Sequence, residues 1–125
     1  MQYLTLIHID PALLAALPQD EYDRLMRGCF EKADALHEAG HLHASQQLLE
    51  PDTARTLRVR DGLARITDGP FAETREFLAG FNLIEAGSMD EAMEIARQFP
   101  WARFGSIEVR PVRDMQAVRA HVGAA

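Results

Sequence analysis

The 125 residues suffice for one domain with a single hydrophobic core, and we expect residues 1–125 to form it. Hydrophobic residues make up 47% and charged residues 26%, as in ordinary soluble proteins. A net charge of -6 without a Lys/Arg block argues against nucleic-acid binding, because neutralising phosphates needs a basic surface. A lone Cys29 excludes an internal disulfide, and no segment resembles a membrane span or signal peptide. We therefore expect a cytoplasmic protein with no membrane partner.

The first half of the chain predicts a strand, a helix and a second strand. Residues 3–8 form a β-type run, and residues 13–17 are apolar enough for a helical turn. Asp20 is the expected N-cap of a long helix, and Gly40 is its expected stop. The apolar stripe of this helix, with residues three and four apart, is Tyr22, Leu25, Met26, Cys29, Ala33 and Leu36. Residues 42–49 form the second strand, which Pro51 ends.

A β-hairpin is predicted in the middle of the chain. Residues 56–60 and 63–67 alternate apolar and polar side chains, and they flank Asp61-Gly62. This dipeptide favours a two-residue turn, because both turn positions require positive φ. We expect one face of the hairpin to be exposed to solvent.

The second half predicts strand, helix, strand and a short terminal helix. Residues 80–86 form a strand, and Ser88 with Glu91 forms a capping box that opens the helix. The expected buried stripe of this helix is Met89, Ala92, Met93, Ala96 and Phe99. Residues 106–112 form the last strand, and residues 113–125 are suited to a terminal helix.

This order of elements predicts an α+β ferredoxin-like sandwich with an inserted β-hairpin. Both main helices then lie on one face of the sheet. The other face must carry polar residues or be covered by a second subunit, and we expect a homodimer.

The most informative stretch is Asp68-Gly69-Pro70-Phe71, a turn placed directly after the hairpin. Together with residues 78–84, 88–92 and 105–112, it resembles the DGPF branch of the YCII-related proteins along nearly the whole chain. The resemblance implies a dimeric α+β barrel, in which two open sheets face each other and enclose pockets. It also implies a suspected enzyme: a His/Asp pair is proposed for YCII-related proteins, and one branch of the family resembles dehydrochlorinases that act on hydroxylated aromatics.

The resemblance also suggests site residues. The carboxylate of the pair maps to Asp68, and the family's histidine falls near Cys29, although no histidine lies between Asp20 and Leu36. His43 is the candidate replacement, so the predicted catalytic residues are Asp68 and His43. The predicted substrate-binding residues are Phe71, Arg75, Phe81 and His8.

Each candidate also has a structural interpretation. Asp68 before Gly69 is a typical turn residue, and Cys29 on an apolar stripe is typical of core packing. His41 and His43 would share one face of a strand, but spacing supplies no third metal ligand, so we expect no metal site. The sequence has no Gly-rich phosphate loop, so we also expect no cofactor.

Two functional hypotheses remain open. One is a cofactor-independent, lyase- or isomerase-like enzyme acting on an unidentified small molecule, with Asp68 as the acid–base group. The other is a non-catalytic ligand-binding or regulatory module, linked to sigma-factor signalling because DGPF genes often neighbour sigma-factor genes. A histidine beside Asp68 in a closed pocket favours the enzyme, and its absence favours the module.

Overall fold

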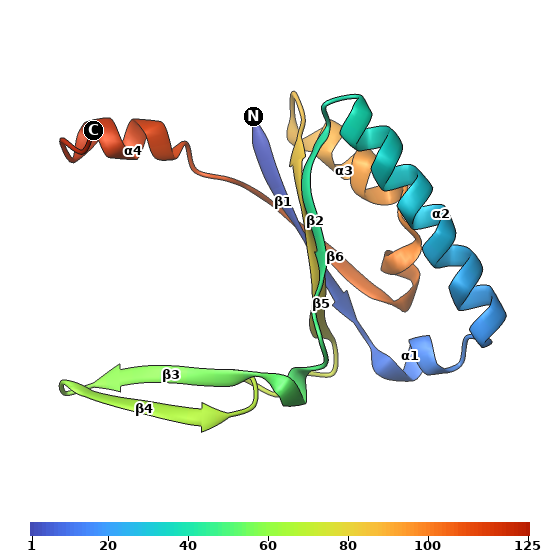
Figure 1. The fold of residues 1–125 in the computed structure, drawn as a ribbon, viewed down its shortest axis with the longest axis horizontal. Coiled ribbons are helices and arrows are strands. Elements are labelled where there is room, and N and C mark those ends of the chain that lie inside the picture. The colour runs from blue at the N-terminus through green and yellow to red at the C-terminus, as the bar shows by residue number, and fades with distance from the viewer.

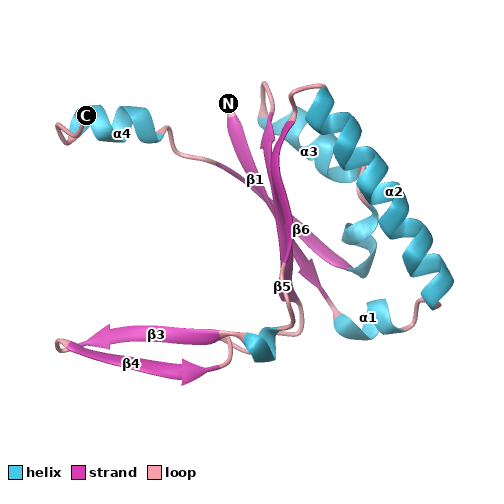
Figure 2. Cartoon of the chain, viewed as in Figure 1, coloured by secondary structure: helices cyan, strands magenta, loops and turns pink.

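The computed structural model describes residues 1–125 and contains a four-stranded antiparallel sheet in the order β2-β5-β1-β6 (Figure 1). Helices α2 (Gln19–Glu38) and α3 (Met89–Arg97) lie together on one face of this sheet (Figure 2). The strands are β1 (Gln2–Ile9), β2 (Leu42–Gln47), β5 (Phe77–Glu85) and β6 (Gly105–Pro111). This arrangement confirms the predicted ferredoxin-like fold of the dimeric α+β barrel type. No helix combines the length and the apolar character needed to cross a bilayer.

The core lies between the sheet and the two helices. Tyr3 pairs with Ile84 across β1 and β5, and both are buried. Since side chains alternate along a strand, Leu4 and Leu6 point to the opposite face of the sheet, which we call the open face. The core cluster consists of Tyr3, Cys29, Leu36, Leu42, Ile84, Ala86, Ala92, Ile95 and Phe99.

The predicted hairpin forms a second, two-stranded sheet inserted between β2 and β5. Its strands are β3 (Arg55–Arg60) and β4 (Leu63–Asp68), and both turn residues have positive φ, 52° at Asp61 and 76° at Gly62. The expectation of only one exposed face is wrong. No other element covers the hairpin, so even its apolar side chains, such as Leu57 and Ile66, are largely exposed.

The remaining elements are short. They are α1 (Pro11–Ala15), the 3-10 helices η1 (Pro51–Thr53) and η2 (Pro100–Phe104), and the C-terminal helix α4 (Met115–His121). The hairpin and α4 both project from the side of the sheet opposite α2 and α3 (Figure 1).

Two predicted helix details are wrong. Helix α2 begins two residues earlier than expected, with Pro18 at the N-cap, so Asp20 lies inside the first turn instead of capping it. Met89 and Met93 are exposed on α3, because its buried stripe is rotated toward Ala92, Ile95 and Ala96. The cap of α3 is as predicted: the Ser88 hydroxyl accepts a hydrogen bond from the Glu91 N–H.

Candidate functional site

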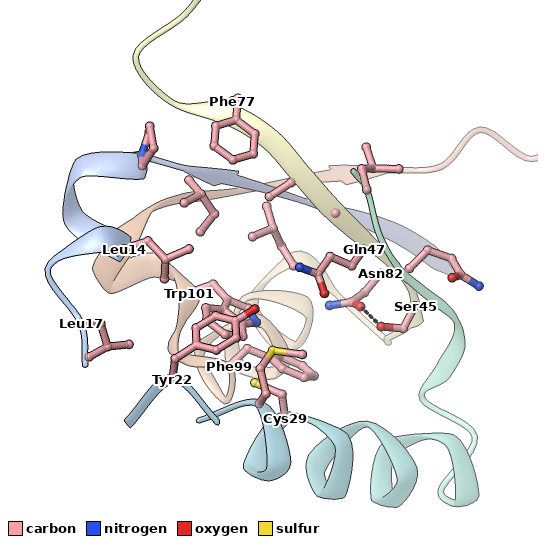
Figure 3. Close-up of a pocket in the computed structure, with 18 of the residues that line it drawn as sticks. Leu14, Leu17, Tyr22, Cys29, Ser45, Gln47, Phe77, Asn82, Phe99 and Trp101 are labelled. Atoms are coloured by element: carbon pink, nitrogen blue, oxygen red, sulfur yellow. Dashed lines mark hydrogen bonds between the residues drawn. The ribbon is translucent and has the colours of Figure 1, made fainter. Parts of the chain in front are cut away.

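A cavity of about 780 Å³ lies between α2 and the sheet (Figure 3). Its size is in the range of small-molecule sites, and 15 of its 23 lining residues are hydrophobic. Helix α2 contributes Tyr22, Met26, Cys29 and Ala33, so the apolar stripe predicted as core partly faces a hollow. The aromatic walls are Tyr22, Phe30, Phe77, Phe99 and Trp101.

The floor of the cavity is made of small residues of β5. Gly80 lies so close to β2 that a Cβ at this position would be 2.7 Å from the Gln46 carbonyl oxygen. With Ala79 beside it, Gly80 leaves the space beneath α2 without side-chain atoms. The close approach of two strands and the hollow above them therefore depend on the same glycine.

Neutral polar groups gather on one side of this floor. The Ser45 hydroxyl donates a 2.6 Å hydrogen bond to Asn82 Oδ1, from the neighbouring strand (Figure 3). The Asn82 amide nitrogen and the Gln47 side chain make no hydrogen bond within the chain, although Asn82 is only 5% exposed. Thr5, which pairs with Asn82 across β1 and β5, has a buried hydroxyl without a partner. Asn82 and Gln47, which line the cavity, therefore have hydrogen-bonding capacity left for a ligand, whereas Thr5 is not part of the lining.

The cavity is almost free of ionised groups. Glu50, which is exposed, is the only acidic or basic side chain in its lining. Burial raises the pKa of the Cys29 thiol, so this group is protonated and uncharged at neutral pH. The lining therefore suits an uncharged molecule better than an anion or a cation.

Trp101 lines the cavity and also packs against the aromatic rings of Tyr22 and Phe104. Its ring centroid lies 6.2 Å from those of Tyr22 and Phe104, at interplanar angles of 45° and 51°. Trp101 thus has a packing role and is also part of the cavity wall.

Asp10 and Arg75 form an ion pair beside the cavity. Asp10 is buried at the end of β1, where Oδ1 accepts a hydrogen bond from the Ala12 N–H and Oδ2 accepts one from Arg75 Nε, both at 3.0 Å. The Ala12 N–H and then the Arg75 guanidinium hold the pKa of Asp10 below its usual range. Pro11, next to Asp10, lines the cavity. Arg75, predicted as a substrate contact, therefore lies near the cavity without lining it.

The other predicted residues of the DGPF segment are more distant. Asp68 ends β4, its side chain is 93% exposed, and its only ionic contact is with Arg55 Nε at 3.5 Å. Phe71 is exposed as well, and neither residue lines the cavity. The catalytic role of Asp68 and the substrate role of Phe71 stay predictions.

The two candidate histidines and Phe81 belong to the sheet. His43 Nε2 lies 3.0 Å from Glu85 Oε1, and His8 Nε2 lies 3.5 Å from Glu108 Oε1. The N-terminal ammonium and then His43 lower the pKa of Glu85. Phe81 pairs with Leu6 and shares the open face with it. The structure does not bring His43 or His8 to Asp68 or into the cavity.

Sequence reasoning missed Ser45, Gln47 and Asn82. Asn82 carried a usable signal, because it is a polar residue in phase with Gly80 and Ile84 on the buried face of a predicted strand. A buried amide within such a run needs a specific partner, and that need marks a candidate site.

Comparisons with known proteins found a matching family model, a relative and a fold neighbour. The model of the YCII-related domain matches residues 1–116. An uncharacterised protein of Rhizobium meliloti (strain 1021) is 40% identical over 114 residues, which span 90% of this chain and 92% of that protein. A similar solved structure is 5-chloro-2-hydroxyhydroquinone dehydrochlorinase (TftG) from Burkholderia phenoliruptrix, in complex with 2,5-dihydroxybenzoquinone. It has a TM-score of 0.52 and 16% identity, with 90% of this chain and 94% of that chain covered, so the likeness concerns the fold.

Proposed function

The chain belongs to the YCII-related family, and from this premise we propose that it binds a small, uncharged ring compound in the cavity between α2 and the sheet. The observation that carries the proposal is the cavity of about 780 Å³, with its mainly hydrophobic lining and neutral polar floor. Such a combination of apolar walls and a few convergent polar groups is typical of small-molecule sites. Cys29, near the place that the family resemblance gives to a histidine, lines this cavity.

The chemistry of the walls narrows the ligand class. Tyr22, Phe77 and Trp101 offer flat apolar surface to a ring. The Asn82 amide nitrogen can donate to a carbonyl or hydroxyl oxygen at the ring edge, and Gln47 can donate or accept there. A fold neighbour is in complex with 2,5-dihydroxybenzoquinone, which makes hydroxylated rings the natural first probes.

We propose binding, not turnover, for this cavity. No histidine lines it, and Glu50 is the only ionised group in its lining. Proton-transfer catalysis needs a titratable group within hydrogen-bond reach of the substrate. Asp68 lies outside the cavity and contacts Arg55 instead of a histidine, which supports the binding hypothesis over the enzymatic one.

The test uses a matched pair of variants on α2. Ala33 lines the cavity, and Ala35 is exposed on the same helix, so Ala33→Leu fills the cavity while Ala35→Leu makes the same change outside it. Titration calorimetry with hydroquinone, resorcinol and 4-hydroxyacetophenone, all uncharged at pH 7, should give saturable binding to the wild type for at least one. Ala35→Leu should bind equally well, and Ala33→Leu should bind at least about tenfold more weakly.

The same titration with 2,5-dihydroxybenzoquinone tests the charge preference, because this compound is acidic and ionised at pH 7. We expect it to bind more weakly than the uncharged phenols, since the cavity offers no cation. The proposal fails if no compound binds the wild type or if Ala33→Leu binds as well as Ala35→Leu.

We also infer that the working unit is a homodimer. The open face carries the apolar residues Leu4, Leu6, Phe81 and Leu83, and no helix of the chain covers it (Figure 1). A second copy is the simplest cover for such a surface, since most soluble oligomers are symmetric homodimers.

A further inference from the structure

A row of polar side chains crosses the buried face of the sheet. Asn82 of β5 pairs with Ser45 of β2 on one side and with Thr5 of β1 on the other. One hydrogen bond forms within this row, in which the Ser45 hydroxyl donates to Asn82 Oδ1 at 2.6 Å. The Asn82 amide therefore has its acceptor end occupied and its donor end free.

The free donor end of Asn82 faces the cavity. Asn82 is the only buried amide or hydroxyl side chain in the lining. Thr5 Oγ1 is the only fully enclosed side-chain polar atom without a partner, so the unpaired Asn82 nitrogen still reaches accessible space. Figure 3 shows this nitrogen on the side of the amide away from Ser45. The N–H groups of Asn82 are thus presented to a ligand in the cavity.

A buried donor restricts which group can be placed against it. An apolar group would displace water from the N–H groups and leave them unpaired, which is costly. A carbonyl oxygen accepts from them and has no proton of its own to place. A hydroxyl can also accept, but its proton then needs an acceptor, and Asn82 Oδ1 is already bonded to Ser45. The amide therefore favours a carbonyl oxygen over a hydroxyl, and either of them over an apolar group.

The other amides of the lining impose no such requirement. Gln46 and Gln47 are exposed, so water can satisfy their side chains when no ligand does. Gln19 already donates to Asp23 Oδ1 at 2.8 Å. Asn82 is thus the amide whose pairing depends on the ligand.

We propose that Asn82 makes the cavity selective for ring compounds that carry a carbonyl oxygen, such as aryl ketones. Asn82 donates to that oxygen, and Ser45 is a positioning residue that holds the amide with its donor end toward the ligand. The ring itself packs against Tyr22, Phe77 and Trp101. The inference rests on the proposed binding function and adds which polar group of the ligand the cavity recognises.

Two phenols of similar size test this selectivity. 4-Hydroxyacetophenone carries a carbonyl oxygen where 4-isopropylphenol carries a methyl group. In titration calorimetry, the wild type should bind the ketone at least about tenfold more tightly than the alkyl phenol. Asn82→Leu should reverse this order, because leucine offers only apolar contact. Thr5→Val is the control: it removes the neighbouring hydroxyl, which is not in the lining, and should keep the wild-type preference.

Two further measurements distinguish recognition by Asn82 from a merely structural role. Ser45→Ala releases the amide and should reduce the preference for the ketone at least about threefold, whereas Ser45→Thr keeps the hydroxyl and should retain the preference. The carbonyl stretching frequency of the isotope-labelled ketone should be lower in complex with the wild type than with Asn82→Leu, because a hydrogen bond weakens the C=O bond. An equal frequency in the two complexes would contradict the proposed contact.

The outcomes separate this inference from the proposed function. If neither phenol binds the wild type, or if Ala33→Leu binds both as well as Ala35→Leu does, the cavity function fails and the inference fails with it. If both phenols bind in the cavity without a preference for the ketone, or if Asn82→Leu keeps that preference, Asn82 does not select the ligand and the cavity function stands. Circular dichroism checks that each variant is folded, and the wild-type preference decides the question even where a variant is not.

Discussion

Arg75 Nε donates to Asp10 Oδ2 across 3.0 Å, joining residues that are 65 positions apart in the chain. The bond ties the loop after the hairpin to the end of β1. Asp10 also caps α1 through the Ala12 N–H, and α1 contributes Pro11 and Leu14 to the cavity wall. One carboxylate therefore fixes both the loop and the helix at this end of the cavity.

Asp10→Asn should lower stability at pH 7, because the amide cannot replace the ionic part of either contact. The folded protein holds the pKa of Asp10 below its unfolded value, so this stabilisation is present above about pH 4 and is lost as the pH falls through the folded pKa. Urea unfolding of both proteins should therefore show a stability difference that shrinks under acid conditions. Asp34→Asn on the exposed surface of α2 is the control and should show neither effect.

Gly80→Ala should destabilise the fold by about 1–3 kcal/mol, because the added Cβ meets the Gln46 carbonyl oxygen at 2.7 Å. The same substitution at Gly28, inside α2 with no atom within 4 Å of the new Cβ, should instead stabilise by about 0.5–1 kcal/mol. Chemical denaturation measures both. Equal effects at the two positions would contradict the close approach of β2 and β5.

Ser45→Ala should cost about 1–3 kcal/mol, since it leaves the buried Asn82 oxygen without its hydrogen-bond donor. The double variant Ser45→Ala/Asn82→Leu should lose less stability than the sum of the losses of the two single variants. It removes both the donor and the acceptor, so it leaves no polar group without its partner. A double-mutant cycle from unfolding curves gives the coupling. Additive effects would mean that the bond between these side chains does not contribute to stability.

Cys29 should react slowly with iodoacetamide in the folded protein. Its raised pKa reduces the reactive thiolate at neutral pH, and its burial restricts access, so we expect labelling at least about tenfold slower than in urea. A phenol bound in the cavity should slow the reaction further, because Cys29 lines the wall. Labelling at the rate of the unfolded chain would show an accessible thiol.

Asp68→Asn should change stability by less than about 1 kcal/mol, because an exposed pair with Arg55 contributes little. Phenol binding should also be unchanged, since Asp68 lies outside the cavity. If a turnover assay is found, a fall of about 100-fold or more with binding intact would assign to Asp68 the acid–base role predicted from sequence.

The sequence predicted those parts of the fold that local patterns encode. The Asp61-Gly62 turn, the Gly40 stop and the Ser88 cap each follow from the backbone preferences of one or two residues. The errors concern the first residue of α2 and the buried side of α3, which local patterns do not determine. Pro18 is as well suited to precede a helix as Asp20 is to cap one, and the apolar Met89 and Met93 lie on a helix side that nothing covers.

The cavity could not be predicted in the same way. Leu14, Tyr22, Gln47, Phe77 and Trp101 line it from five separate segments, and their meeting depends on tertiary packing. Periodicity identified the apolar stripe of α2, but it could not show that part of this stripe lines a cavity instead of packing in the core. Family resemblance and turn chemistry favour Asp68, and neither of them measures exposure or distance from a pocket.

The hairpin is closed at its base by the Gly69 N–H, which donates to the Ala54 carbonyl oxygen at 2.7 Å. The rest of the insertion contributes nothing to the core, so its sequence can drift in evolution without disturbing the fold. For the same reason, the tip at Asp61-Gly62 is a suitable place to graft a reporter peptide.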